Sequence, residues 1–204
     1  GQSTLTRAGD GPESVFSTVG KPTCPYDTYH VVSLDGRRLP VNTPGELSIK
    51  GPGIFTGYYM APEENANAFD REGFFRTGDL AVIDEKGYVT LTGRIKEMIN
   101  RGGESISATE VEKLIIEHPG VALVAVVAMP DPSLGERVCA YIQPKAGASL
   151  SFEQVVAYLR ERKASVLHLP ERIEFVDAMP LTQAQKVDKR FLRADIAQKI
   201  EQGR

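Results

Sequence analysis

The chain has 204 residues, of which 41% are hydrophobic and 25% charged, and its formal net charge is −3. This is the composition of an ordinary globular protein, and a chain of this length forms one or two domains that each bury a core. The lack of a basic excess argues against nucleic acid as a partner. The longest apolar run, residues 121–129, is too short to cross a bilayer, so we expect no membrane association.

The sequence offers little for metal or thiol chemistry. Its only cysteines, Cys24 and Cys139, are far apart and have no cysteine partner at the spacing of a zinc site. Its three histidines are scattered, without metal-ligand spacing. We therefore expect no metal site within this chain and a location in the reducing cytoplasm.

Residues 1–95 are rich in glycine and turns and show almost no helical periodicity. Short apolar runs between turn signals predict strands at residues 28–34, 46–50, 79–84 and 88–93. Asp84–Gly87 is predicted to form the hairpin turn between the last two, and residues 61–69 are the one predicted helix. This half is therefore predicted to be a small, mostly antiparallel β subdomain.

Residues 96–204 alternate between helix and strand patterns. Capping boxes begin at Ser107 and Ser151, and Asp188 is placed to cap a last helix. Apolar runs predict strands at residues 121–128, 137–143 and 172–176. The pattern predicts a small α+β domain with a three-stranded sheet and helices, so the whole chain is assigned to the α+β class. The two halves join at a short polar segment, residues 94–97, which has the composition of a hinge rather than of a long linker.

Three clusters of residues carry possible chemistry. In the first, Thr77-Gly78-Asp79 places a carboxylate at a strand start, where it can accept hydrogen bonds from two vicinal hydroxyls of a ribose. Taken alone, these residues are more often an ordinary turn with a capping aspartate, because Gly and Asp dominate turns.

The second cluster crowds Arg94, Lys96 and Arg101 before the pair Gly102-Gly103. Arginine donates forked hydrogen bonds to ribose or phosphate, but a solvated segment that ends in a loop is the alternative.

The third cluster is a polar loop that carries Lys186 just before a capped helix. A lysine on a mobile loop can place a charge in a site, although most such lysines are ordinary surface residues.

In this order, the clusters resemble the adenylate-forming superfamily of acyl- and aryl-CoA ligases, peptide-synthetase adenylation domains and luciferases. The similar stretches are residues 45–59 (core stretch), Arg76–Asp79 (ribose-binding aspartate), Gly93–Glu104 (hinge and following loop) and Pro180–Lys186 (catalytic lysine). Within the superfamily, the chain most resembles aryl-acid–AMP ligases of siderophore biosynthesis, such as 2,3-dihydroxybenzoate–AMP ligases.

The resemblance implies roles for the matching residues in adenylation. Asp79 would bind the ribose hydroxyls of ATP, and Arg94 would contact the same ribose or the phosphate. Lys186 would be the catalytic residue, which bridges the substrate carboxylate and the α-phosphate. Relatives usually have glycine directly before that lysine, whereas this chain has Gln185.

The resemblance also implies a second step after a domain swing. Lys96 would be the hinge residue, and the loop of Gly102, Gly103 and Glu104 would line the path of a pantetheine thiol. Residues 1–95 would be the end of the large ATP-binding domain, and residues 96–204 the mobile C-terminal domain that carries the catalytic lysine.

The implied function is that of a C-terminal fragment of an ATP-dependent aryl-acid–AMP ligase. Such an enzyme converts a carboxylate and ATP into an acyl-adenylate and pyrophosphate, then transfers the acyl group to a thiol of CoA or of a carrier protein. The phosphate loop, the acid pocket and the residue associated with Mg²⁺ would lie upstream, so we expect the isolated chain to be inactive without the upstream half of the enzyme.

Two alternatives stay open at this stage. The chain is also compatible with a fragment of an acyl- or aryl-CoA ligase, and with a non-catalytic module that binds a carrier protein or a partner subunit. Residues 1–95 are expected to expose an apolar face without the upstream half, so dimerisation of the fragment is a further expectation.

Overall fold

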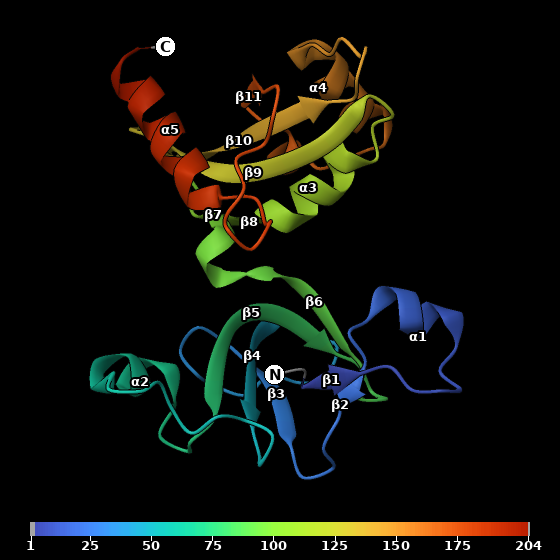
Figure 1. The fold of residues 1–204 in the computed structure, drawn as a ribbon, viewed down its shortest axis with the longest axis vertical. Helices are drawn as coiled ribbons and strands as arrows, with labels where there is room; N and C mark the ends of the chain where they lie inside the picture. Colours follow the sequence, from blue (N-terminus) through green and yellow to red (C-terminus); the bar gives the residue numbers. More distant parts are fainter. Residues whose placement is uncertain (1–2, 204) are drawn as a thin grey trace. The chain divides into compact units, whose positions relative to one another are not determined.

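The computed structural model describes residues 3–203, and the chain divides after Lys96 into two compact units (Figure 1). The predicted boundary, after residue 95, lies one residue earlier. The predicted α+β class is confirmed, since both units combine helices with sheets. Within the described residues, no helix has the length and apolar character needed to span a membrane.

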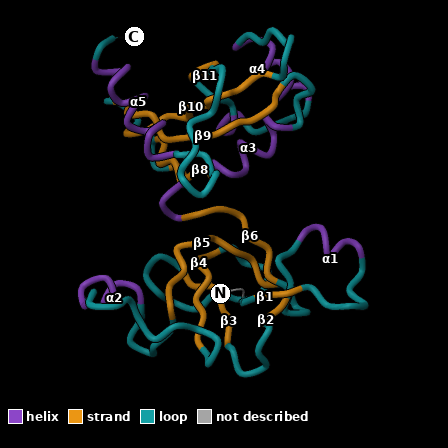
Figure 2. Tube along the Cα trace, in the orientation of Figure 1, coloured by secondary structure: helices purple, strands orange, loops and turns teal. Residues whose placement is uncertain are grey.

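The first unit consists mainly of strands and loops (Figure 2). In chain order its elements are β1 (Thr4–Leu5), α1 (Pro12–Ser17), β2 (Lys21–Pro22), β3 (Thr28–Val32), β4 (Gly45–Lys50), α2 (Pro62–Ala68), β5 (Phe75–Ile83) and β6 (Val89–Arg94). Strands β3-β4-β5-β6 form an antiparallel sheet in that order. Its core contains Val31, Leu47, Ile49, Ala81 and Val89.

One helix of this unit, α1, was not predicted. It has six residues, none of them buried, and its N-cap residue, Gly11, makes no side-chain capping hydrogen bond. A helix this short has neither the apolar stripe nor the capping signal by which a sequence pattern reveals a helix.

The second unit begins within the short 3₁₀ helix η1 (Ile95–Glu97), which spans the division. Its further elements are β7 (Met98–Arg101), β8 (Glu104–Ser107), α3 (Ala108–Ile116), β9 (Val121–Asp131), β10 (Gly135–Pro144), α4 (Phe152–Glu161), η2 (Val166–His168), β11 (Arg172–Phe175) and α5 (Lys189–Glu201). Alternate residues of β9 and β10 face opposite layers, as strand geometry requires. Val126 and Val138 pack with α3 and α4, whereas Val127 and Cys139 pack with α5.

The prediction of a three-stranded sheet in this unit is wrong, because the sheet has five strands. The three predicted strands are present as β9, β10 and β11, and the hairpin β7–β8 extends the sheet beyond them. Each hairpin strand has only four residues and mixes polar with apolar side chains, so the sequence pattern predicts no strand there. Ile99 and Ile106 nevertheless point into the core, where each is almost fully buried.

Candidate functional site

Strand β5 contains a bulge at the predicted ribose-binding motif. Leu47 of β4 alone lies opposite the three β5 residues Thr77, Gly78 and Asp79, because the ladder resumes on either side of them. Gly78 has a φ of +72°, a left-handed conformation that glycine adopts at little cost. The Thr77 hydroxyl donates to the Leu47 carbonyl oxygen at 2.8 Å and accepts from the Asp79 N–H at 3.1 Å. The bulge therefore has a defined, hydrogen-bonded shape.

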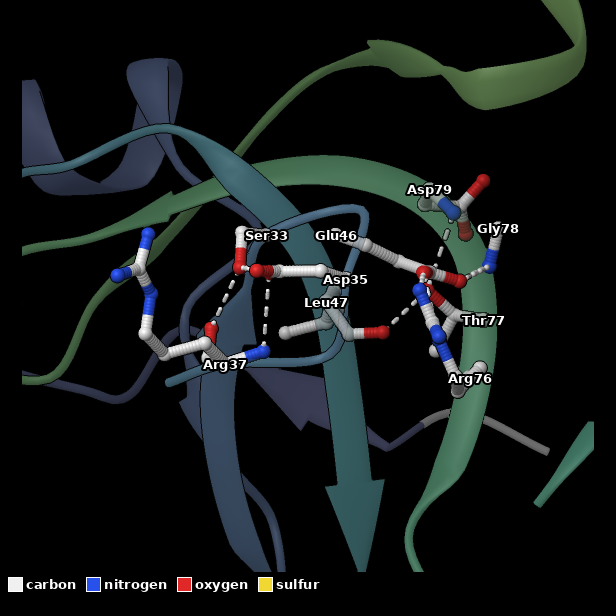
Figure 3. A network of polar contacts seen from close by, with 9 residues as sticks. All are labelled: Ser33, Asp35, Arg37, Glu46, Leu47, Arg76, Thr77, Gly78 and Asp79. Carbon is white, nitrogen blue, oxygen red and sulfur yellow. Dashed lines mark hydrogen bonds and ion pairs between the residues drawn. The ribbon is translucent and has the colours of Figure 1, made fainter. Parts of the chain in front are cut away.

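A buried carboxylate, Glu46 of β4, holds this bulge from the neighbouring strand (Figure 3). Its Oε1 accepts from the Gly78 N–H at 3.1 Å, and its Oε2 accepts from Arg76 Nε at 2.7 Å and from Arg76 Nη2. Glu46 is only 5% exposed, so these charge-assisted hydrogen bonds form largely away from water. The sequence analysis did not assign this role to Glu46, for which the only signal was one acidic residue within the predicted strand 46–50.

The two predicted nucleotide-binding residues lie side by side. Asp79 pairs with Arg94 across β5 and β6, and Arg94 Nε donates to Asp79 Oδ1 at 2.8 Å. The Asp79 side chain is partly buried at 26% exposure, whereas that of Arg94 is 65% exposed. The arrangement presents a carboxylate acceptor suited to hydroxyl groups beside a planar donor suited to ribose or phosphate oxygens.

The glycine-rich stretch Gly51-Pro52-Gly53 encloses a side chain of the protein itself. Asp27 Oδ1 accepts a hydrogen bond from the Gly53 N–H at 3.1 Å. A Cβ atom on Gly51 would lie 2.1 Å from Asp27 Oδ1 and 2.6 Å from Asp27 Cα. These glycines therefore make room for Asp27, and the arrangement explains them without a phosphate ligand.

Gly102 and Gly103 form a tight hairpin turn between β7 and β8. Their φ angles of +58° and +93° suit the two-residue turn in which Arg101 and Glu104 face each other. The Gly102 N–H donates to the Leu134 carbonyl oxygen at 2.8 Å, so this side of the turn is fixed to the connection between β9 and β10. Gly103 and Glu104 are exposed, and a Cβ atom on Gly103 would meet open space.

Lys186 follows a tight turn that begins at Thr182. The Thr182 N–H donates to the Lys186 carbonyl oxygen at 2.7 Å, and the Lys186 N–H donates to Thr182 Oγ1 at 3.3 Å. The Lys186 side chain is exposed, which leaves its ammonium group accessible to an anionic ligand. Gln185 has a φ of +57°, the left-handed conformation that favours glycine. This residue therefore carries backbone strain directly before the predicted catalytic lysine.

The described residues offer no reactive thiol in the core and no metal centre. Burial raises the pKa of the Cys139 thiol to about 12, so this cysteine stays protonated and unreactive. Within residues 3–203, no group of three or more His, Cys, Asp or Glu side chains is placed to hold a metal ion.

The predicted site residues thus fall into separate groups. Asp79 and Arg94 form one pair in the first unit. Lys96, an exposed residue of η1, is the last residue of that unit. The Gly102–Glu104 turn and Lys186 belong to two different turns of the second unit.

Residues 110–186 match the family model described as the AMP-binding enzyme C-terminal domain. The second unit belongs to this family.

Relatives cover nearly the whole chain. Enterobactin synthase component E of Escherichia coli K12 is 45% identical over 94% of the chain and 35% of its own length. The 2,3-dihydroxybenzoate-AMP ligase of Bacillus subtilis 168 is 42% identical over 97% of the chain and 36% of its own length.

A further relative belongs to another class of ligase. Medium-chain fatty-acid–CoA ligase of Escherichia coli K12 is 44% identical over 82% of the chain and 30% of its own length. Among solved structures, ATP-bound MatB from Rhodopseudomonas palustris matches with a TM-score of 0.84 and 34% identity, over 93% of the chain and 37% of MatB. The chain therefore spans about a third of the length of these relatives. It is homologous to the C-terminal part of AMP-forming aryl-acid ligases.

Proposed function

We propose that the chain is the C-terminal part of an ATP-dependent aryl-acid–AMP ligase. The whole enzyme would convert an aryl carboxylate and ATP into an acyl-adenylate and pyrophosphate. It would then transfer the acyl group to a pantetheine thiol, which forms a thioester and releases AMP. The observation that carries this proposal is the contact between Asp79, on the hydrogen-bonded bulge of β5, and Arg94 of β6. It occurs in a chain that is 45% identical over 94% of its length to enterobactin synthase component E.

In the first half-reaction, Asp79 would accept hydrogen bonds from the ribose hydroxyls of ATP, and Arg94 would donate to the ribose or the phosphate. Lys186 would contact the substrate carboxylate and the α-phosphate together. Its charge would oppose the repulsion between two anions and stabilise the negative charge that develops during in-line displacement. Mg²⁺ would accompany ATP, but the described residues do not form a site for it, so no step here depends on a ligand from this chain.

In the second half-reaction, a change of backbone conformation at Lys96 would turn the second unit. The exposed Gly103–Glu104 side of the hairpin turn would then face the incoming thiol, and the absence of a side chain at Gly103 would leave space for it. The acceptor would be the phosphopantetheine of a carrier protein or CoA. The identity of 44% to a medium-chain fatty-acid–CoA ligase supports an acyl- or aryl-CoA ligase as the second candidate function.

The test is ATP–pyrophosphate exchange by the full-length enzyme with a panel of aryl and acyl acids. We expect exchange with an aryl acid, no exchange by residues 1–204 alone, and loss of exchange in Lys186→Ala. Adding CoA or a carrier protein to a preformed adenylate then separates the two candidate functions. Full exchange activity of Lys186→Ala would contradict the assignment of the lysine.

A further inference from the structure

A cluster of three charged residues joins distant parts of the second unit. Lys189, the first residue of α5, places its Nζ 2.9 Å from Glu112 Oε1 of α3 and also contacts Glu97 Oε2. Glu112 Oε1 in turn accepts a hydrogen bond from the Val126 N–H of β9 at 2.7 Å. All three side chains are only about a fifth exposed, so the contacts are better shielded from water than ordinary surface ion pairs.

The position of Lys189 is electrostatically unusual. The first turn of a helix carries partial positive charge and favours acidic side chains, and Asp188 satisfies this preference by accepting from the N–H groups of Arg190 and Phe191 at 3.1 Å. A lysine beside that cap is disfavoured by the helix itself. The two carboxylates compensate for it, so the ammonium group is held by tertiary contacts rather than by local preference.

Lys189 lies three residues after Lys186, which stands at the end of the Thr182–Lys186 turn. Val187, between them, pairs with Leu181 across the base of the turn and packs against the core. The Asp188 N–H donates to the Pro180 carbonyl oxygen at 2.8 Å and closes the same base. A displacement of the first turn of α5 therefore moves the Lys186 turn with it.

We propose that Lys189 is a positioning residue for adenylation. This inference rests on the proposed function of Lys186. Glu97 is the first residue of the second unit, directly after the proposed hinge residue Lys96. The Lys189 ammonium group ties Glu97 and Glu112 to the start of α5. The Lys186 turn thereby keeps a fixed position relative to Glu97, where the second unit begins. When the second unit rotates at the hinge, Lys186 is therefore already oriented for adenylation.

The test compares Lys189→Met, Lys189→Arg and Lys199→Met in the full-length enzyme. Lys199 is a matched control, because it lies on the same helix, is 28% exposed and contacts two carboxylates, Glu174 and Asp195, each at 2.7 Å. We expect Lys189→Met to lower the kcat of ATP–pyrophosphate exchange about 10- to 100-fold, as a displacement near 1 Å does, with the KM for ATP within about twofold. Transfer from a preformed adenylate to the thiol is expected to stay within about twofold.

Lys189→Arg is expected to recover most of the exchange rate, and Lys199→Met to keep it within about threefold. Glu112→Gln still accepts from the Val126 N–H, so it serves as a second variant should Lys189→Met not fold, with a smaller expected loss of about 3- to 10-fold. Unchanged exchange in Lys189→Met, or an equal loss in both half-reactions that Lys199→Met reproduces, would overturn the inference while leaving the function of Lys186 intact. Unchanged exchange in Lys186→Ala would instead overturn the proposed function, and the positioning role with it.

Discussion

Glu46→Gln is the substitution that most directly probes the β5 bulge that contains Asp79. The amide keeps the size of the side chain, and its carbonyl oxygen can still accept from the Gly78 N–H. It loses the negative charge that the Arg76 guanidinium contacts through two nitrogens. The substitution therefore removes the ion pair and leaves the shape of the core in place.

The expected cost follows from burial. Hydrogen bonds to a charged group contribute about 1.5–3 kcal/mol, and Glu46 is 5% exposed while Arg76 is 28% exposed. Because water reaches part of Arg76, the lower part of that range applies, and we expect a loss of about 2 kcal/mol. Glu46→Ala also removes the acceptor for the Gly78 N–H, so its expected cost is larger, about 3–4 kcal/mol.

Amide hydrogen exchange of β5 measures this effect locally. A loss of about 2 kcal/mol corresponds to about 30-fold less protection of the Gly78 amide in Glu46→Gln. Under the proposed function, the KM for ATP should also rise about 5- to 30-fold, because Asp79 loses its fixed orientation toward two hydroxyls. Glu72→Gln is the control, since Glu72 makes an exposed ion pair with Arg38 in the same unit. Equal protection in the wild type, Glu46→Gln and Glu72→Gln would refute the reasoning.

Three other substitutions test the structure elsewhere. Gln185→Gly should stabilise the second unit by about 0.5 kcal/mol in urea unfolding, because relief of left-handed strain exceeds the added chain entropy; a loss of stability would contradict the strain. Gly51→Ala should destabilise the first unit by about 1–3 kcal/mol in the same assay, because its Cβ would meet the Asp27 backbone; an unchanged midpoint would show that Asp27 moves freely. Burial raises the pKa of Asp195, but hydrogen bonds from Lys199 and Tyr141 outweigh it and lower the pKa below the ordinary 3.8. The ionised Asp195 carboxylate thus stabilises the fold above pH 3.8, and this stabilisation is lost as the pH falls through the lowered pKa. Lys199→Met should therefore weaken the acid dependence of the unfolding midpoint. An identical pH profile of the midpoint would exclude this contribution.

Local signals in the sequence determined much of the fold. Ser107 and Ser151 both cap helices, the latter in a complete capping box, and Asp188 caps the last helix. These contacts join residues three positions apart or fewer, so they depend on the local pattern alone. The candidate residues Asp79 and Lys186 were found in the same way, because each stands in a short motif.

Only the tertiary structure decided how those residues are held. The Glu46–Arg76 contact spans 30 positions and the Lys189–Glu97 contact spans 92, and nothing in the local pattern of either partner identifies the other. The β7–β8 hairpin was likewise decided by Ile99 and Ile106, which gain their burial from a core that forms only when β9, β10 and α3 pack together. Sequence determined which groups are available for chemistry, whereas long-range packing and buried charge determined where they lie, because both depend on partners that the chain brings together only on folding.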